Sequence, residues 1–430
     1  MSFEPSAIAH PKIAVIGAGI SGMGAAHMLS PDHHVTLYEA QPRLGGHART
    51  IIAGKNGDQP VDTGFIVFNY ANYPHLVRLF EQLDVPVTAS NMSFGASIDG
   101  GRLEYGLASA GAVFAQRRNA VNPAYLRMLR DIFHFNGRAL QVANDPEMTI
   151  SDLLARLGTG RWFRDYYLLP LSGAIWSTPK EQILEFPAQA MMRFFDNHAL
   201  ISYSGQHQWY TVQGGSVQYV DRLEAYLRRN NVTLRPGCPV QAVRRTPTGV
   251  EVKAAGAWEA FDQVVMATHS DDSLALLADP SPDEVRNLGP IAYQPNDIVL
   301  HADASVMPRR RAVWSSWNYT EDAGKRPGQI DLTYWMNKLQ PIPREDPHFV
   351  TLNSTRPIRE DLIYDQVTLR HPVYDLAALQ AQGRVRDMNG ARNTWFCGAW
   401  MKDGFHEDGL GSAVDVVDAI TARRVLAAAA

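Results

Sequence analysis

A glycine-rich hexapeptide near the start of the chain has the spacing needed to bind a dinucleotide. GAGISG occupies residues 17–22, directly after the β-branched run Lys12–Ile16 and before a small-residue stretch that predicts a helix as far as Leu29. Glycines at these positions permit a tight turn, close approach of a pyrophosphate and close packing of helix on strand. The first N–H groups of the helix would face the phosphates. We therefore expect cofactor contacts from Gly17, Ala18, Gly19, Ile20, Ser21 and Gly22.

An acidic residue stands where such a site would hold a ribose. Val35–Glu39 predicts the second strand of a β-α-β unit, and Glu39 ends it. A carboxylate there accepts hydrogen bonds from a ribose diol and would repel a 2′-phosphate. We expect Glu39 and the adjacent Ala40 to contact the ribose.

A second glycine-containing loop follows the strand. RLGGHART spans residues 43–50, so its glycines permit a turn close to the cofactor and its arginines could neutralise the pyrophosphate. Dehydrogenases that bind only NAD do not need this loop. The expected contacts are Arg43, Gly45, Gly46, His47 and Arg49.

The two loops and Glu39 together resemble the superfamily of flavin amine oxidases, protoporphyrinogen oxidases and phytoene desaturases. These proteins hold FAD with GxGxxG, a ribose-binding Glu and an RxGGRxxS/T loop, and His47 departs from the second arginine of that loop. The resemblance implies an α/β, amine-oxidase-like fold. It has a discontinuous Rossmann-type FAD-binding domain and a second, mixed α+β substrate domain.

The C-terminal region supports this resemblance, since in the superfamily the corresponding residues lie against the flavin ring. CGAW begins at Cys397, and GFHEDGL runs from Gly404 to Leu410 before a small-residue helix. Reduced flavin carries negative charge near N1, which the positive end of a helix stabilises. We expect Gly409 and Leu410 to supply the N–H groups, with Gly398, Ala399, Phe405 and His406 beside them.

Two further interpretations concern how the cofactor is held. Family members commonly bind adenine through backbone groups at the position of Val240, although the residue is also a plain strand start. Cys397 lies within a predicted strand and not in the loop where some members attach FAD, so we interpret it as a small buried side chain. FAD is therefore expected to be non-covalent.

The candidate catalytic residues are His406 and Glu407, which would lie at the flavin edge. A neutral imidazole there could remove a proton as hydride leaves, but the loop could equally serve only to orient the cofactor. Asp62, Asp403 and Asp408 are weaker candidates, because Asp62 fits a turn and Asp408 fits an N-cap of the final helix.

A closer resemblance points to a substrate. VDTGFIVFNYANYP (61–74), AIWSTP (174–179), VQGGS (212–216) and GFHEDGL (404–410) are similar to bacterial FAD-dependent oxidoreductases associated with cyclopropane and methyl-branched fatty acid synthesis, including the route to furan fatty acids. The resemblance implies a desaturase of methylated or unsaturated fatty acyl chains. Hydride would pass to flavin N5, and oxygen, a quinone or another carrier would then reoxidise the flavin.

The elements that position these residues alternate along the chain. Strand patterns at Val250–Lys253, Gln263–Ala267 and Trp395–Gly398 predict that the cofactor domain returns late. We assign residues 1–71, 205–287 and 379–430 to the FAD-binding domain. Residues 72–204 and 288–378, which are richer in aromatic residues and Met, form the expected substrate domain.

Bulk composition excludes several classes of protein. A net charge of -4 and a pI near 6.4 argue against nucleic-acid binding. Cys238 and Cys397 form neither a disulfide framework nor a metal cage, so no metal is expected. The N-terminus lacks a secretory pattern, and the apolar run Tyr166–Trp176 is too short to span a membrane. The expected location is cytoplasmic, with peripheral contact on the inner membrane.

Other features allow alternatives. Residues 123–140 place Leu126, Leu129, Ile132, Phe133 and Leu140 at helical spacing among arginines, which fits either an anionic membrane surface or packing on the core; Arg309–Arg311 gives a second basic cluster. Large aromatic residues could line a lipid tunnel or fill the core: Trp176, Trp209, Trp314, Trp317, Tyr334 and Trp335.

Competing functions also remain open at this point. A flavin amine or amino-acid oxidase would use a lysine near N5, for which Lys338 and Lys402 are candidates without a matching motif. A non-catalytic escort that binds acyl or prenyl chains, as in the Rab escort relatives of the superfamily, is the second alternative. The oligomeric state is not predicted.

Overall fold

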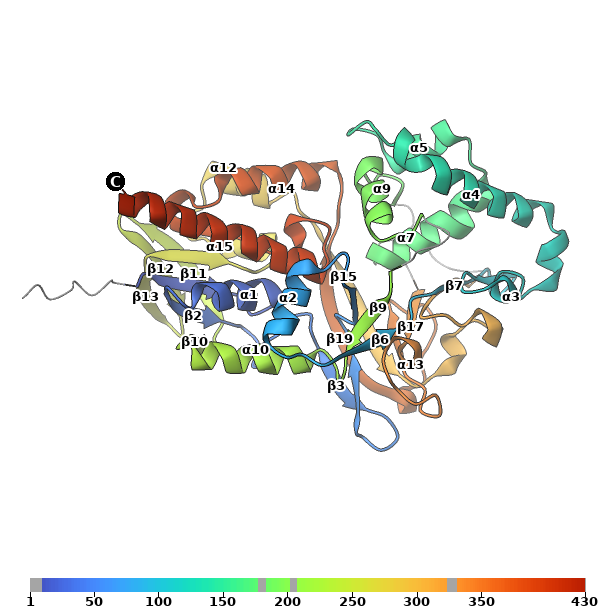
Figure 1. Ribbon diagram of the computed structural model, residues 1–430, viewed down its shortest axis with the longest axis horizontal. Helices are drawn as coiled ribbons and strands as arrows, with labels where there is room; N and C mark the ends of the chain where they lie inside the picture. The colour runs from blue at the N-terminus through green and yellow to red at the C-terminus, as the bar shows by residue number, and fades with distance from the viewer. Residues whose placement is uncertain (1–9, 177–182, 202–206, 323–330, 430) are drawn as a thin grey trace, which may run out of the picture.

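The computed structural model describes residues 10–176, 183–201, 207–322 and 331–429 (Figure 1). Parts of two sequence motifs, residues 1–9 of the N-terminal segment and 177–179 of AIWSTP, lie outside the described residues. In Figure 1 the parallel sheet and helices α1, α10 and α15 form one end of the molecule, and helices α3, α4, α5, α7 and α9 gather at the other.

A five-stranded parallel sheet forms the first domain. Its order is β10 (Thr233–Arg235), β2 (His34–Tyr38), β1 (Lys12–Ile16), β14 (Gln263–Met266) and β20 (Thr394–Phe396). The strand order reverses direction between β1 and β14, and open α/β sheets bind ligands at such a switch point. The predicted strands at both ends of the chain are confirmed as neighbours in one sheet.

Helices α1 (Ile20–Leu29) and α15 (His406–Ala429) pack together on this sheet, and α2 (Pro74–Gln82) and α10 (Val217–Arg229) flank them (Figure 1). Small residues allow the close approach, since a Cβ on Gly24 would lie 2.4 Å from Leu410 Cδ1. Buried side chains of α1, β2, α2, α10 and α15 share one hydrophobic core. This core sets the two helix N-termini side by side.

A smaller antiparallel sheet and three helices cover the other face. The sheet contains β11 (Val240–Thr246), β12 (Gly249–Ala254) and β13 (Ala257–Phe261); the helices are α11 (Ser270–Leu276), α12 (Pro282–Leu288) and α14 (Leu376–Met388). The predicted strand Val250–Lys253 therefore belongs to this sheet and not to the parallel one.

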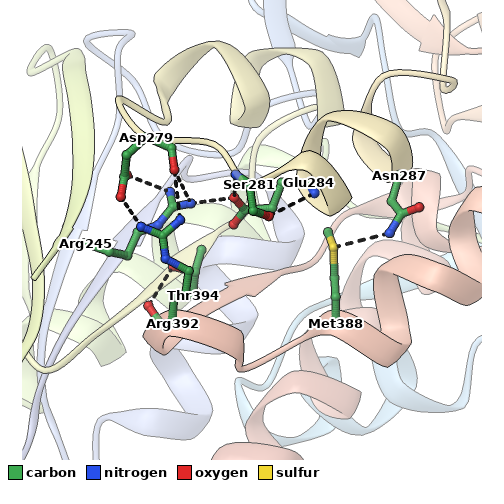
Figure 2. A network of polar contacts seen from close by, with 8 residues as sticks. All are labelled: Arg245, Asp279, Ser281, Glu284, Asn287, Met388, Arg392 and Thr394. Carbon is green, nitrogen blue, oxygen red and sulfur yellow. Dashed lines mark hydrogen bonds and ion pairs between the residues drawn. The ribbon is translucent and has the colours of Figure 1, made fainter. Parts of the chain in front are cut away.

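A polar network ties the late segments of this domain together (Figure 2). Arg245 of β11 donates to Glu284 at 2.5 Å and to the Asp279 carbonyl at 3.2 Å. Arg392, just before β20, donates to the same carbonyl and pairs with the Asp279 carboxylate. Segments separated by more than a hundred positions are thus held as one unit.

The second domain combines a large mixed sheet with a helical layer. Its seven strands follow the order β19 (Ile363–Pro372), β15 (Tyr293–His301), β18 (Phe349–Leu352), β17 (Asp331–Trp335), β16 (Trp317–Thr320), β7 (Phe94–Ile98) and β8 (Leu103–Gly106). Only β16 and β7 pair in parallel. The helices are α3 (Ala110–Val113), α4 (Pro123–Val142), α5 (Ile150–Leu157), α6 (Arg161–Phe163), α7 (Leu169–Trp176) and α9 (Ala188–Asn197), and most contribute to one core with the sheet.

Short strands lie at the junction of the domains. They form the hairpin β3 (Thr50–Ala53) and β4 (Gln59–Asp62), and a sheet of β5 (Val67–Asn69), β9 (Trp209–Val212) and β6 (Val87–Ser90). Helix α2 falls in the range expected for the substrate domain but packs in the core with α1, whereas Ala53 and Val61 of the hairpin pack in the substrate-domain core. The chain therefore crosses between the two cores more often than its composition indicates.

Asp62 is the polar centre of this junction. Its buried carboxylate accepts hydrogen bonds from Thr50 Oγ1 at 2.6 Å, from the N–H and hydroxyl of Ser216, and from Gln340 Nε2 at 2.9 Å. Burial raises the pKa of Asp62 to about 6 against these donors, so the group is ionised at neutral pH. It links the hairpin, the start of α10 and the segment after α13 (Met336–Leu339), which is a structural role and not the catalytic one considered from sequence.

Removing this carboxylate should destabilise the protein. Asp62→Ala leaves several buried donors without an acceptor, so we expect a loss of about 2–4 kcal/mol of unfolding free energy. A clear fall in Tm in a thermal scan measures this loss. The control, Asp58→Ala, removes an exposed carboxylate of the same hairpin and should leave Tm within about a degree; equal Tm values for the two variants would contradict the assignment.

Candidate dinucleotide and flavin site

The turn between β1 and α1 packs its backbone so closely that two of its three glycines leave no room for a side chain. Gly17 has a φ of +97°, and a Cβ on Gly22 would lie 1.8 Å from the Gly17 carbonyl oxygen. A Cβ on Gly19, in contrast, would meet nothing within 4 Å. Gly17 and Gly22 are therefore required by the turn itself, while Gly19 borders open space in front of the helix N-terminus, where a pyrophosphate would fit.

Glu39 lies against the same turn. Its carboxylate accepts hydrogen bonds from the N–H of Ala18 at 2.7 Å and of Gln41 at 2.9 Å. The Glu39 carbonyl accepts from Cys238 N–H, which brings the segment before Val240 beside the end of β2. The predicted ribose and adenine residues Glu39, Ala40 and Val240 are thus neighbours, and their contacts with a cofactor stay predictions.

The second glycine loop packs directly on the first. Gly45 N–H donates to the Ala18 carbonyl at 2.8 Å, and a Cβ on Gly46 would lie 2.9 Å from Gly19 Cα. Arg43 donates to the carbonyls of Gly46 and Ala48, so its guanidinium stabilises the loop. The loop is in place to meet a pyrophosphate, although Arg43 is already engaged with the backbone.

Arg49 is used differently from the sequence prediction. Its guanidinium forms a bidentate ion pair with Asp365 of β19, at 2.5 and 2.9 Å, and also donates to Thr63 Oγ1. A bidentate pair fixes both partners strongly. Arg49 therefore links the glycine loop to the substrate domain, and neutralisation of a pyrophosphate by this residue would compete with that pair.

His47 belongs to a group of histidines that sequence analysis missed. Its ring centroid lies 5.9 Å from that of His269 and 5.5 Å from that of His371. Burial lowers the pKa of His47 to about 4 and that of His269 and His371 to about 3. The positive charge of Arg370 lowers the pKa of His47 and His269 further. His269 follows β14 at the switch point, and this position after the strand could have identified it as a site residue from sequence.

A potential metal-binding group beside these histidines is already neutralised. Ligand atoms of His269, Asp271 and Asp272 lie within 4.8 Å of one another. Arg370 pairs with both carboxylates at 2.5 Å and lies over the ring of Tyr293, which stacks on His269. A guanidinium occupies the place of a cation, so this group gives no support for a metal.

The N-terminus of α15 begins earlier than predicted. The helix starts at His406, and Gly409 N–H donates to the Phe405 carbonyl at 3.1 Å. Asp408 accepts from Phe405 N–H, which is the backward half of a capping box, so Asp408 is not the N-cap residue itself. The prediction that Gly409 supplies a free N–H is wrong, because the groups without partners in a first turn are those of its first residues.

The other predicted contact residues of the C-terminal region pack within the protein. Gly398 N–H donates to Ser412 Oγ, and Leu410 is buried against α1. A Cβ on Gly409 would lie 2.9 Å from Ser21 Oγ, so this glycine allows the contact of the two helix starts. Cys397 is fully buried, and burial raises the pKa of its thiol to about 12, in agreement with a small core side chain.

Glu407 and His406 are both engaged within the protein. The Glu407 carboxylate accepts from the N–H groups of His75 and Leu76 and so caps α2. The His406 ring stacks on Phe65 at a centroid distance of 4.0 Å, and its Nε2 lies 2.7 Å from the Tyr219 hydroxyl. Burial lowers the pKa of His406 to about 3, so the imidazole is neutral. Capping explains Glu407 without a catalytic role.

A row of aromatic rings leads from the substrate domain to Phe405, directly before α15. Phe405 stacks on Phe194 of α9 at 4.8 Å, and Phe194 also contacts Trp176 at 4.8 Å. His198 stacks on Phe194 at 4.0 Å, and burial lowers its pKa, so it adds no charge. Trp314 and Trp335 instead form a separate core cluster with Met307 and Phe349. Phe194 and His198 had no signal beyond aromatic composition.

The two lysines considered for amine oxidation are both engaged. Lys402 Nζ lies 3.3 Å from the Asp415 carboxylate of α15. Lys338 donates to the Trp314 carbonyl and lies over the Trp335 ring, within the separate core cluster. Neither is in the aromatic row.

Comparison with known proteins agrees with this geometry. The family described as flavin containing amine oxidoreductase matches residues 20–309. Short segments match curated proteins: zeta-carotene desaturase of Zea mays is 36% identical over 73 residues, and a flavin-dependent L-tryptophan oxidase of Lentzea aerocolonigenes is 44% identical over 52 residues. These segments cover 17% and 12% of this chain, and only 12% and 11% of the respective relatives.

Solved structures share the whole fold at low identity. A CLA-producing fatty acid isomerase from P. acnes has a TM-score of 0.67 and 15% identity, over 95% of this chain and 98% of the other. A putative protoporphyrinogen oxidase from Exiguobacterium sp. has a TM-score of 0.69 and 17% identity, over 96% and 99%. The amine-oxidase-like fold with FAD as its cofactor is confirmed.

Gly19 offers a test of the phosphate site that leaves the fold intact. Gly19→Ala puts a methyl group into the open space before α1, where it would meet FAD but no protein atom, so we expect at least about tenfold weaker FAD binding. The Tm of the apoprotein should not fall. FAD content after gel filtration and a thermal scan measure the two effects.

Gly137→Ala is the matched control, because a Cβ at this exposed position of α4 also meets nothing within 4 Å. It should retain FAD at the wild-type level. If Gly19→Ala retained FAD equally well, the cofactor would not lie against this turn.

Proposed function

The chain belongs to the flavin containing amine oxidoreductase family and is an FAD-dependent oxidoreductase, and we propose that it desaturates methylated or unsaturated fatty acyl chains. The observation that carries the proposal is the uncharged aromatic row of Phe194, His198 and Phe405. The row ends at residues 404–410, which we call the flavin loop because we expect them to lie against the flavin ring. An apolar wall at that place suits a hydrocarbon chain better than an ammonium group.

The residues of this row would bind and orient the chain. Phe194 and Phe405 offer apolar faces, and a neutral His198 avoids the cost of burying a charge beside a hydrocarbon. FAD, when bound, would accept a hydride from an activated C–H bond of the substrate, and the neighbouring carbon would lose a proton to solvent as the double bond forms. Close packing of the rings would also exclude water from the reacting carbon.

His406 is proposed as a positioning residue in this reaction. Burial keeps the Tyr219 phenol protonated by raising its pKa, so Tyr219 can donate to His406 Nε2. Together with stacking on Phe65, this contact fixes the imidazole at the start of α15. To act as a base, His406 would first have to break its hydrogen bond with Tyr219. We therefore propose that His406 orients the flavin loop.

The relatives support a lipid substrate only by analogy. A zeta-carotene desaturase shares a short segment with this chain, and a fatty acid isomerase shares its fold. The engaged lysines Lys338 and Lys402 weigh against the amine or amino-acid oxidase alternative. A non-catalytic escort is disfavoured because the family binds FAD.

Peripheral contact with an anionic membrane completes the proposal, because acyl chains are available mainly in membrane lipids. No helix in the part of the chain that the structure describes is long and apolar enough to cross a bilayer. We propose a cytoplasmic protein that works at the inner membrane, holds FAD non-covalently and is reoxidised by oxygen, a quinone or another carrier.

Anaerobic reduction distinguishes the substrate classes. Holoenzyme mixed with phospholipid vesicles that carry monounsaturated or methyl-branched acyl chains should lose its yellow colour, and mass analysis should show acyl chains lighter by two hydrogens. Putrescine and L-tryptophan serve as amine probes and should leave the spectrum unchanged. Bleaching by the amines but not by the lipids would reject the proposal.

The aromatic row can be tested separately. Phe194→Ala removes a ring that contacts Phe405, so we expect the KM for the acyl substrate to rise by about tenfold with FAD content unchanged. Trp258→Ala, which removes an exposed aromatic ring of β13, is the control and should leave KM unchanged. Equal KM values for both variants would exclude Phe194 from the substrate path.

A further inference from the structure

Five arginines line one open hollow at the end of the substrate domain far from the parallel sheet. The hollow has a volume of about 950 Å³, and its guanidinium groups come from three separate segments: Arg102, Arg117, Arg118, Arg309 and Arg310. Two of the segments are the β7–β8 turn and the 3-10 helix η1 (Arg117–Val121), which follows α3 (Figure 1). Sequence analysis had identified Arg309–Arg311 and the arginines near α4 only as separate basic clusters.

Buried polar groups hold the segments in this arrangement. Glu104 of β8 is fully buried and accepts from Arg309 N–H at 2.7 Å and from Arg310 Nη1 at 2.8 Å. Gln116, also buried, donates from Nε2 to the Gly101 carbonyl at 2.9 Å. The three segments around the hollow are therefore held together by buried hydrogen bonds.

Positive charge in the hollow exceeds its internal neutralisation. Arg102 pairs with Asp99 and Arg310 with Glu104. Among the described residues, the side chains of Arg117 and Arg309 have no acidic partner. Gathering uncompensated guanidinium groups is unfavourable unless an anion is bound, and their planar donors suit the oxygens of a phosphate.

An exposed apolar ridge continues from the hollow along α4. Leu126, Phe133 and Leu140 are 42%, 61% and 41% exposed, and their seven-residue spacing aligns them on one side of the helix. Val121, 80% exposed, ends η1 and leads into α4. The helix packs on the core through other residues: Tyr125, Met128, Phe135 and Ala139.

The arrangement of the two features identifies the partner. Arg127, Arg130 and Arg138 are exposed on the same helix, and their spacing places them along one side of the ridge, where Arg130 also pairs with Asp131. A soluble anion would need the hollow but not the ridge, and an apolar protein partner would need the ridge but not the unpaired charge. A bilayer surface supplies both, because acyl chains lie directly beneath phosphate headgroups.

We propose that the arginine hollow binds the phosphate of an anionic phospholipid in a bilayer while the ridge of Leu126, Phe133 and Leu140 lies in the interface. This inference deepens the proposed function, on which it rests for its biological sense, by naming the membrane-contacting site. It places the substrate domain against the bilayer and the FAD domain away from it (Figure 1).

Vesicle co-flotation of the holoenzyme tests the site. Wild-type protein should partition onto vesicles of phosphatidylglycerol and phosphatidylcholine at least tenfold better than onto pure phosphatidylcholine, and added salt should weaken the binding. The double variant Arg117→Glu and Arg309→Glu should lose at least tenfold in partition, and Phe133→Ser should lose severalfold. Wild-type binding by the double variant, or equal binding to both kinds of vesicle, would overturn the proposal.

Matched controls lie on the FAD domain. Arg229→Glu reverses an exposed charge of α10, and Val425→Ser removes a 63% exposed apolar side chain of α15; both should bind vesicles as wild type does. Binding of inorganic phosphate to the hollow without any vesicle binding would also overturn the bilayer assignment. Because partition is measured without turnover, a failed desaturation assay does not affect this result.

Discussion

The close approach of two helix N-termini over one glycine turn is the constraint on which the structure depends. Helices α1 and α15 come from opposite ends of the chain, and they meet because Gly24 and Gly409 offer no side chain at their contact. The parallel sheet places both at the switch point between β1 and β14. Two positive helix ends thus lie side by side at the proposed FAD site, where they would favour an anionic pyrophosphate and an electron-rich ring.

Polar contacts at the junction then fix the substrate domain relative to this turn. Asp62 gathers donors from three segments, and Arg49 connects the second glycine loop to Asp365 of the large sheet. Burial lowers the pKa of His47 and His406, so these two imidazoles are neutral. The connections at the junction are instead made by charged side chains, the Asp62 carboxylate and the Arg49 guanidinium.

The parts of the site that could be predicted from sequence are those that depend on residues close together in the chain. The glycine turn, Glu39 and the C-terminal segment were recognisable because each requires particular residues at short spacing. The start of α15 was placed too late in the chain, because Asp408 caps the helix backward from its third position and is not the N-cap residue itself. His371 could not have been assigned to the site, since a long antiparallel pairing brings β19 to it.

The role of α4 stayed open for the same physical reason. Apolar residues at helical spacing fitted either a membrane surface or the core, and the helix has two apolar faces, of which Tyr125 and Phe135 belong to the buried one. Leu126 and Phe133 stay exposed beside arginines, although a protein that gained nothing from this exposure would lose little by replacing them with polar residues. In the proposed membrane orientation, α4 lies at the end of the molecule remote from the glycine turn (Figure 1), so positive charge there would attract lipid without lying beside the reacting carbon.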